Sequence, residues 1–380
     1  MFTKMLKNEL EYIRKKNRYR KRFILPENVV NFSSNDYLGL KDNPETKEKL
    51  CKYIGNISLG SGASPLVSGY TDIQKELESL LASFKETENC IVVGSGYLAN
   101  TGLIPALATE EDIIFSDELN HASIIDGIRL SKAKKIIYRH NDINDLEDKL
   151  KKYKPKRISF IITDGVFSME GDIAPLEDIY FLAEKYSAVV IIDDAHGTGI
   201  LGDGKGSLFH FNLKPQENII QMGTLSKAVG SYGAFICGTK VLIEYLINKM
   251  RTGIFSTALS PVQQFISLEN LRKLIKEDFR RKYVLNTSKA LWDSLKRIGY
   301  KIDFHGTPIL SLVLGSDEKA LKFRDLLLKE GFFIQAIRPP TVPEGTARLR
   351  ITISYNHKEE EIKNLIKTFD NLYREVSSHE

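Results

Sequence analysis

The segment between residues 158 and 192 constrains the fold more than any other part of the sequence. Residues 158–163 form a continuous apolar and β-branched run, as expected for a strand that is buried on both faces. A helical pattern over residues 176–186 separates this run from a second one at residues 188–192. A strand, a helix and a strand in this order pair in parallel. The sequence therefore predicts an α/β protein built on a mostly parallel sheet.

The same alternation continues along most of the 380 residues. Further strands are predicted at residues 90–93, 113–115, 219–222, 234–237, 309–314, 333–337 and 349–353, and further helices at residues 1–22, 72–84 and 97–108. A chain of this length suits one large domain and one smaller domain. We expect an N-terminal helix and extended segment over residues 1–40, a large domain over 41–275, and a small C-terminal α/β domain over 276–380.

The charge and cysteine content favour a cytoplasmic protein. The 54 basic and 49 acidic residues give a net charge of +5, and many of the basic ones lie between residues 14 and 22. We interpret this stretch as solvated surface, or as a patch that meets an acidic substrate, rather than as a nucleic-acid site. Three isolated cysteines follow no zinc pattern and suit a reducing compartment. No apolar run reaches the roughly 18 residues that a membrane span requires. We therefore expect no nucleic-acid or membrane partner.

Polar residues follow the predicted strands of the large domain. In chain order they are Gly94-Ser-Gly-Tyr97, Asp117 and His121, Asp164 and Ser168, Asp193 and His196, and finally Thr224 and Lys227. Ligands of open parallel sheets bind beyond the carboxyl ends of the strands. The sequence therefore predicts a site at this edge of the sheet.

Each motif at this edge also has another interpretation. Residues 94–99 fit a dinucleotide-binding pattern, with Asp117 as the acid that would bind a ribose. That interpretation leaves Asp193, His196 and Lys227 without a function, and a glycine pair after a strand suits any phosphate at a helix N-terminus. Asp193 and His196 are both possible metal ligands, but no third ligand has suitable spacing, so we expect no metal.

Lys227 decides among these alternatives. It lies in Gly223-Thr-Leu-Ser-Lys-Ala-Val-Gly230, a loop of small residues between two apolar strands. Such a loop would place the amine inside the site, where desolvation favours its nucleophilic neutral form. A buried lysine, a carboxylate on a neighbouring strand and a glycine-rich phosphate site are what pyridoxal phosphate requires. The sequence therefore predicts a pyridoxal-phosphate enzyme.

Six motifs then resemble the α-oxoamine synthase family, and they run in order along nearly the whole chain. They are Asn31-Phe-Ser-Ser-Asn-Asp-Tyr-Leu-Gly39, Gly60-Ser-Gly-Ala-Ser64, Asn120-His-Ala-Ser123, Phe167-Ser-Met-Glu-Gly-Asp172, Asp193-Asp-Ala-His-Gly-Thr-Gly199 and Thr224-Leu-Ser-Lys227. The resemblance implies a fold type I pyridoxal-phosphate transferase, with a mostly parallel seven-stranded sheet and a smaller C-terminal domain. Members of this family condense an amino acid with an acyl thioester and release carbon dioxide.

The resemblance also implies how the cofactor ring is held. Lys227 would be the Schiff-base lysine and the acid/base that moves the Cα proton. Asp193 would pair with the ring nitrogen, and His121 would stack on the ring at the substrate side. Ser168 and His196 would hydrogen-bond the phenolic oxygen of the ring or atoms near it.

The cofactor phosphate has its own implied set of residues. Gly96, Tyr97 and Thr224 would bind it within one subunit. Thr257, in Phe255-Ser-Thr257, would reach the phosphate of the neighbouring subunit, because sites in this family lie at a dimer interface. The resemblance therefore implies a homodimer with shared active sites.

The substrates are implied by the same resemblance. Arg350 would bind the amino-acid carboxylate, Thr341 would lie at the substrate, and Arg20 would meet the acidic end of the acyl chain. The stretch Arg338-Pro-Pro-Thr-Val-Pro-Glu-Gly-Thr-Ala-Arg-Leu-Arg350 resembles members that join L-alanine to a pimeloyl thioester, carried by coenzyme A or by acyl carrier protein. A relative that joins glycine to an acetyl thioester is one alternative, and a non-catalytic partner subunit is another.

Overall fold

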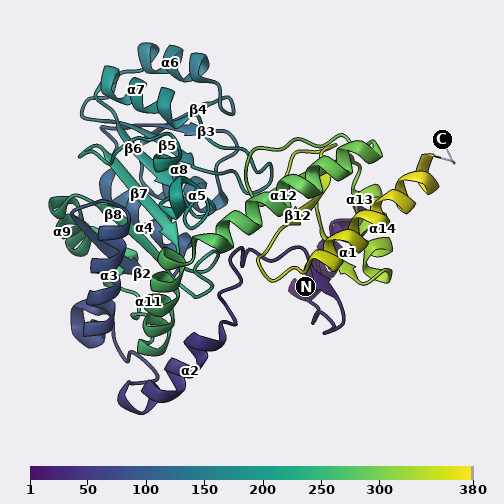
Figure 1. Ribbon diagram of the computed structural model, residues 1–380. Coiled ribbons are helices and arrows are strands. Elements are labelled where there is room, and N and C mark those ends of the chain that lie inside the picture. The colour runs from purple at the N-terminus through teal and green to yellow at the C-terminus, as the bar shows by residue number, and fades with distance from the viewer. Residues whose placement is uncertain (378–380) are drawn as a thin grey trace. The chain divides into compact units, whose positions relative to one another are not determined.

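The computed structural model describes residues 1–377, and these divide into two compact units (Figure 1). The large unit comprises residues 36–168 and 172–282. The small unit comprises residues 1–35, residues 169–171 and the chain from Tyr283 onward. The domain boundaries expected at residues 40 and 275 remain predictions.

The large unit contains a seven-stranded sheet in the order β2-β8-β7-β6-β5-β3-β4. Its strands are β2 (Asn89–Val93), β3 (Ile113–Asp117), β4 (Lys134–Tyr138), β5 (Ser159–Asp164), β6 (Val189–Asp193), β7 (Ile219–Thr224) and β8 (Ala234–Gly238). β8 is antiparallel to both of its neighbours, whereas β4, β3, β5, β6 and β7 pair in parallel. The predicted mostly parallel sheet is confirmed.

Both faces of this sheet are covered by helices, as the continuous apolar strands require. The large unit contains the helices α2 (Pro44–Tyr53), α3 (Asp72–Phe84), α4 (Gly96–Leu107), α5 (Ala122–Leu130), α6 (Ile143–Lys152), α7 (Leu176–Tyr186), α8 (Ser207–His210), α9 (Lys240–Lys249), α10 (Arg251–Ile254) and α11 (Pro261–Lys276), of which α2 packs on α11 rather than on the sheet. Successive residues of β6 face opposite sides: Ile191 packs with α4, α5 and α9, whereas Val190 and Ile192 pack with α6 and α7.

The small unit is built on an antiparallel three-stranded sheet. Its strands are β9 (Ile309–Gly315), β11 (Gln335–Ile337) and the central β12 (Ala347–Thr352), and a separate parallel pair joins β1 (Val30–Asn31) to β10 (Phe332–Phe333). Its helices are α1 (Phe2–Lys15), α12 (Asp278–Ile298, which starts in the large unit), α13 (Asp317–Lys329) and α14 (Glu359–Ser377). All six residues of β12 are buried, because β12 is the central strand of the sheet and α13 packs on that sheet.

Two expectations about single elements were wrong. The helix predicted over residues 1–22 ends at Lys15, and Asn17 then adopts a left-handed conformation with φ of 56° that ends a helix. The strand β4 was not predicted. Its sequence, KKIIY, begins with two exposed lysines because it is an edge strand, and charged edge strands lack a continuous apolar run.

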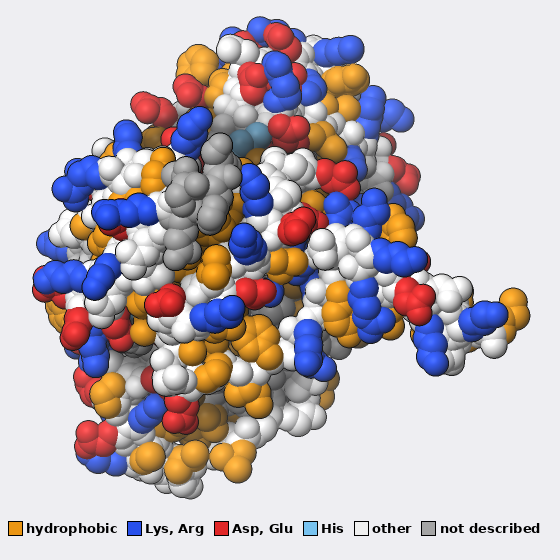
Figure 2. All heavy atoms as spheres, turned by 90° about the vertical axis from the view of Figure 1, so that its right-hand side faces the viewer, with side chains coloured by type: hydrophobic (Ala, Val, Ile, Leu, Met, Phe, Trp, Pro, Cys, Tyr) orange, Lys and Arg blue, Asp and Glu red, His pale blue; other side chains and the backbone are white. Residues whose placement is uncertain are grey.

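The charges of the surface are mixed on the face that Figure 2 shows. Lys and Arg side chains lie there among Asp and Glu side chains and hydrophobic groups. A nucleic-acid site normally presents a basic stripe or patch of one sign. This face presents no such single-signed area in the described part of the chain.

Candidate active site

The carboxyl edge of the large unit's sheet surrounds a cavity of about 180 Å³. The cavity is lined by Gly96, Tyr97, His121, Ser123, Asp164, Asp193, Ala195, His196, Met222, Thr224, Ser226 and Lys227. These residues come from the ends of β5, β6 and β7, from the loops that follow β6 and β7, and from the starts of α4 and α5. The predicted site residues at this edge are therefore brought together, with the exception of Ser168 and Thr257.

Lys227 is linked to two other side chains in the large unit. Its Nζ lies 2.8 Å from Nε2 of His196, and Nδ1 of His196 lies 2.7 Å from the hydroxyl of Tyr37. His196 and Tyr37 are buried, whereas Lys227 is half-buried and faces the cavity. A neutral imidazole donates from one nitrogen and accepts at the other. The chain Lys227–His196–Tyr37 therefore couples the protonation of the amine to the tautomer of the imidazole.

Asp193 occupies the end of β6, and its carboxylate is held from both sides. Oδ2 accepts a hydrogen bond of 2.7 Å from Nδ2 of Asn100, and Oδ1 accepts one of 3.0 Å from the N–H of Ala195. Asn100 lies in α4 and is completely buried. These contacts fix the orientation of a buried carboxylate beside the cavity.

His121 caps the N-terminus of α5 and lies exposed in the cavity. Its Nδ1 lies 2.7 Å from the hydroxyl of Ser123, which in turn accepts a hydrogen bond from Asn100. Desolvation by the surrounding protein lowers the pKa of His121, and the nearby Lys227 cation lowers it too, against the attraction of Asp193. The ring is therefore neutral and aromatic near pH 7, as a stacking residue should be.

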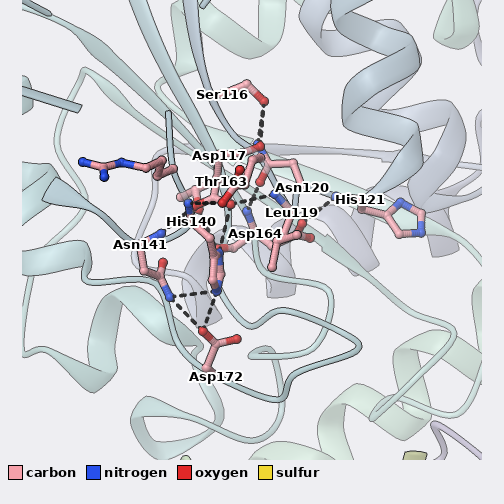
Figure 3. Close-up of polar contacts among 12 residues, drawn as sticks. Ser116, Asp117, Leu119, Asn120, His121, His140, Asn141, Thr163, Asp164 and Asp172 are labelled. Atoms are coloured by element: carbon pink, nitrogen blue, oxygen red, sulfur yellow. Dashed lines mark hydrogen bonds and ion pairs between the residues drawn. The ribbon is translucent and has the colours of Figure 1, made fainter. Parts of the chain in front are cut away.

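Asp164, at the end of β5, is the register partner of Asp193 on β6. Its Oδ2 accepts a hydrogen bond of 2.7 Å from the N–H of His121 (Figure 3). Burial raises the pKa of Asp164 well above its ordinary value, and the neighbouring Asp193 carboxylate raises it further. Two adjacent carboxyl groups at one site, one of them with a pKa raised by burial and by the other, are typical of functional sites rather than of stable cores.

The start of α4 offers donors for an anion. The first N–H groups of a helix have no partner within the helix, and its dipole favours negative charge there. Gly96 begins α4 and lines the cavity together with the hydroxyls of Thr224 and Ser226, which lie 2.7 Å apart. The hydroxyl of Tyr97 instead donates to Asp126, away from these groups. A phosphate at this point would meet backbone N–H groups and two hydroxyls.

Two predicted cofactor residues lie elsewhere. Thr257 lines a second cavity, of about 230 Å³, between α3, β2 and the segment that follows α10. Ser168 lies four residues beyond the end of β5 and is not among the residues that line the first cavity. Their predicted contacts to the cofactor stay predictions.

Of the four predicted substrate residues, His121 belongs to the large unit, and Arg20, Thr341 and Arg350 belong to the small unit. Arg20 donates to the hydroxyl of Thr341 over 3.0 Å, so two of them are in contact. Arg20 also lines a cavity of about 540 Å³ with other basic side chains, Arg14, Lys21, Arg324 and Arg338. Arg350 is buried on β12 and donates to Oδ1 of Asn35 over 3.1 Å.

Neither a metal centre nor a membrane span is found in the described residues. No group of three or more His, Cys, Asp or Glu side chains among residues 1–377 is placed to hold a metal ion. In the same part of the chain, no helix is both long and apolar enough to cross a membrane.

The sequence and the fold are similar to those of known proteins. The sequence model of aminotransferase class I and II matches residues 27–369. The chain belongs to this family. Among curated members, 8-amino-7-oxononanoate synthase of Lysinibacillus sphaericus is 46% identical over 346 residues, which are 91% of this chain and 89% of that protein.

Solved structures show the same architecture. The 8-amino-7-oxononanoate synthase of Francisella tularensis superposes with a TM-score of 0.80 at 28% identity, covering 93% of this chain and 100% of that chain. A structure of SPT with PLP as an internal aldimine superposes with a TM-score of 0.88 at 29% identity, covering 92% and 88% of the two chains. The fold type I assignment and the resemblance to α-oxoamine synthases are thereby confirmed for this aminotransferase class I and II protein.

Three residues of the site were not predicted as site residues from the sequence. They are Tyr37, Asn100 and Ser123. Asp164 was expected only at this edge of the sheet, without a role. Tyr37 and Ser123 lie within the motifs of the resemblance, although no contact was predicted for them. Asn100 is different: it lies in the middle of a helix pattern, and only the fold shows that it faces Asp193.

Proposed function

We propose that this chain is a pyridoxal-phosphate-dependent 8-amino-7-oxononanoate synthase of biotin biosynthesis. It condenses L-alanine with a pimeloyl thioester and yields 8-amino-7-oxononanoate, carbon dioxide and the free thiol. The carbon–carbon bond forms at Cα of alanine, the thiol leaves from the pimeloyl carbonyl, and the alanine carboxylate leaves as carbon dioxide. The curated relatives that carry this name, at 45–46% identity over most of their length, support the choice of substrates.

The single observation that carries the proposal is the arrangement around Lys227. A primary amine, a buried carboxylate and an aromatic imidazole line one cavity together with the first turn of α4. This donor set fits pyridoxal phosphate: Lys227 for its aldehyde, Asp193 for its ring nitrogen, and the start of α4 with Thr224 for its phosphate. The structure of SPT with PLP, which has the same fold, supports the same cofactor for this chain.

When bound, pyridoxal phosphate supplies an electron sink for the carbanion at Cα. The remaining work belongs to the chain. Asp193, fixed by Asn100 and the N–H of Ala195, would pair with the protonated ring nitrogen of the cofactor. His121, whose pKa is lowered by desolvation, would cover the ring face without adding a charge that competes for the electrons.

Lys227 is the group that moves the Cα proton. Its amine accepts that proton at Nζ and later returns one to the product carbon. Nε2 of His196, 2.8 Å away, accepts a hydrogen bond from the resulting ammonium group, and Tyr37 supports the other nitrogen of the imidazole. The hydrogen-bonded chain Lys227–His196–Tyr37 thus orients the amine in both of its protonation states.

The small unit supplies the proposed substrate residues. Arg350 binds the alanine carboxylate, and Arg20 with Thr341 meets the acidic end of the pimeloyl chain. A guanidinium is suited to both tasks because it binds carboxylates in a bidentate manner. The acyl carrier, coenzyme A or acyl carrier protein, is acidic in either case, and the basic stretch at residues 14–22 suits both.

We further propose a cytoplasmic homodimer in which Thr257 contributes to the partner's site. In this chain Thr257 lines a cavity separate from that of Lys227, so the family resemblance, and not a contact within the chain, supports this role. The phosphate would then be bound from both subunits.

The decisive test is an assay of thiol release with four substrate pairs: alanine or glycine with pimeloyl or acetyl thioester. We expect the alanine and pimeloyl pair to react fastest. Preference for glycine and acetyl thioester would replace the proposed substrates with those of a glycine C-acetyltransferase and leave the cofactor assignment intact.

An optical test separates an enzyme from a non-catalytic subunit. The purified protein with added pyridoxal phosphate should be yellow, and borohydride should fix the cofactor to Lys227, as peptide mapping would show. A colourless protein that does not bind the cofactor would exclude the proposed function altogether.

A further inference from the structure

His140 lies outside the cavity, in the turn between β4 and α6, and has a carboxylate at each ring nitrogen (Figure 3). Nδ1 lies 3.0 Å from Oδ1 of Asp117, and Nε2 lies 2.7 Å from Oδ2 of Asp172. An imidazole can donate to two carboxylates only when both nitrogens carry a proton. Burial opposes this charge, but the two carboxylates outweigh it and raise the pKa of His140 to about 10. His140 is therefore a cation near pH 7.

The first carboxylate holds the loop that carries His121. Asp117 ends β3 with its side chain completely buried, and it also accepts the N–H groups of Leu119 and Asn141, each over 2.9 Å. The loop from Asp117 to His121 is then tied to the neighbouring strand by Asn120, which donates to the carbonyl of Ile162 over 2.7 Å.

The end of this loop is also hydrogen-bonded to Asp164, the last residue of β5. The N–H of Asp164 donates to Oδ1 of Asn120 over 2.9 Å, and the carboxyl of Asp164 accepts the N–H of His121. Figure 3 shows this continuous path from His140 through Asp117 and Asn120 to His121. Any movement of Asp117 is therefore passed to the backbone that positions the His121 ring.

The second carboxylate holds the turn that carries Ser168. The bridge between Val166 and Ile173 and the hydrogen bond of 2.9 Å from Phe167 N–H to the carbonyl of Asp172 close this turn. The His140 ring packs edge-on against Phe167 with its centroid 4.4 Å away. Residues 169–171 within the turn belong to the small unit, so Asp172 is where the chain re-enters the large unit.

We propose that His140 is a positioning residue that ties the His121 loop and the Ser168 turn together by bridging Asp117 and Asp172, and so sets the cofactor-binding geometry. The inference rests on the proposed function, because the two loops matter as contacts of the cofactor. Replacing the cation by a neutral side chain leaves the buried carboxylate of Asp117 and the largely buried carboxylate of Asp172 without a positive charge between them. The two loops then separate, although the sheet beneath them is intact.

The other charged groups around His140 do not supply this cation. Glu118 accepts the backbone N–H of His140 over 2.9 Å and adds another negative charge. The neighbouring Arg139 is two-thirds exposed and pairs with Asp142 and Asp145 instead. The phenol of the buried Tyr138 has a pKa raised by burial and by Asp117, so it stays neutral. The charge of His140 is thus the one that faces both Asp117 and Asp172.

The test compares His140→Asn and Asp172→Asn with two controls. His210→Asn makes the same change at an exposed histidine that also packs edge-on against a phenylalanine, Phe211, 5.2 Å away. Asp112→Asn weakens an ion pair with Arg157 at the opposite ends of β3 and β5, and so matches the loss of stability without touching the loops. Three quantities are measured: pyridoxal-phosphate affinity by absorbance titration without substrates, kcat and KM for alanine, and backbone hydrogen exchange of the cofactor-free protein.

We expect His140→Asn to weaken cofactor affinity and to lower kcat by about tenfold to a hundredfold, as small misplacements of site groups do. The alanine KM should change by less than about threefold, because the residue proposed to bind the alanine carboxylate, Arg350, lies outside these loops. Exchange should rise in residues 117–121 and 166–173. Asp172→Asn, which is nearly isosteric, should show the same pattern if His140→Asn folds poorly.

The pH dependence gives an independent readout. The bridge that His140 forms between Asp117 and Asp172 contributes fully below the ordinary histidine pKa of about 6.5. In the native protein this contribution is lost as pH rises through about 10. With only Asp117 left in Asp172→Asn, the pKa of His140 falls, so cofactor affinity should decline at a lower pH than in the native protein. In His140→Asn, cofactor affinity should not show this decline with pH, because the titrating imidazole is absent.

The outcomes separate the two proposals. If His140→Asn melts like Asp112→Asn but keeps cofactor affinity, kcat and loop exchange within about twofold of native values, His140 is only a structural residue and the inference is wrong. If the native protein binds no cofactor while hydrogen exchange in the two loops still rises in both variants, His140 does tie the two loops together but the proposed function is wrong.

Discussion

The two edges of the seven-stranded sheet use the same kinds of residue in opposite ways. At the amino edge, Asp112 precedes β3 and is fully paired: it accepts the guanidinium of Arg157 and the N–H groups of Thr109 and Ile158. At the carboxyl edge, Asp164 and Asp193 lie side by side on β5 and β6, and both line a cavity.

The pKa values of these groups record the difference. Burial alone would raise the pKa of Asp112, but the bonds from Arg157 and Thr109 outweigh it and lower that pKa. Burial and a second carboxylate instead raise the pKa of Asp164. One edge satisfies its charges locally and stabilises the fold, whereas the other keeps like charges together, which costs stability and is useful only for binding or catalysis.

The largest effect is expected at the carboxyl edge. Asp193→Asn keeps the shape of the side chain but removes the charge that stabilises a protonated cofactor ring. We expect kcat/KM to fall by at least about a hundredfold, as for the loss of a preorganised electrostatic contact. The melting temperature of the cofactor-free protein should stay the same or rise, since relief of repulsion with Asp164 compensates for the lost hydrogen bond. Steady-state assays and thermal melts measure both.

The matching change at the amino edge reverses this pattern. Asp112→Asn should lower the free energy of unfolding by about 1–3 kcal/mol, because it leaves the Arg157 charge and buried donors with weaker acceptors. kcat/KM should stay within about twofold of the native value, since the residue is remote from the cavity. If instead Asp112→Asn impairs catalysis as much as Asp193→Asn does, the division between the two edges is wrong.

The Asp112 effect should also depend on pH in a definite direction. Its folded pKa is lowered, so its contribution is present above the ordinary aspartate pKa of about 3.9 and is lost as pH falls through the folded value. Unfolding measured by denaturant titration should therefore show the full difference between Asp112→Asn and the native protein near pH 7. The difference should shrink below about pH 4.

The sequence could predict the parts of the site that follow directly from strand ends. Asp193, Thr224 and Lys227 come at or soon after apolar runs, and the carboxyl ends of parallel strands meet at one edge of the sheet. The sheet was predictable for the same reason, except for β4, whose lysines hide the apolar pattern of an edge strand.

Contacts between distant segments could not be predicted in this way. Asn100 and Tyr37 reach Asp193 and His196 from segments 93 and 159 residues away in the chain, and no local pattern encodes that approach. His140 is a similar case. It follows a strand that was not predicted, and its two carboxylate partners lie 23 and 32 residues away.

The smallest effect is expected at Tyr97, and it sharpens what the carboxyl edge does. The resemblance assigned Tyr97 to the cofactor phosphate, yet its ring is about half exposed and its hydroxyl donates to Asp126. If Tyr97 helps to bind the phosphate, its backbone N–H at the start of α4 does so, because that group points along the helix axis toward the N-terminus.

Tyr97→Phe should therefore change pyridoxal-phosphate affinity and kcat by less than about threefold, since it removes only a surface hydrogen bond. Tyr97→Pro, which removes the N–H at the second position of the helix while tolerating the helical backbone, should weaken cofactor affinity by about tenfold or more. Absorbance titration of both variants measures the difference, and equal losses in the two would assign the contact to the side chain instead.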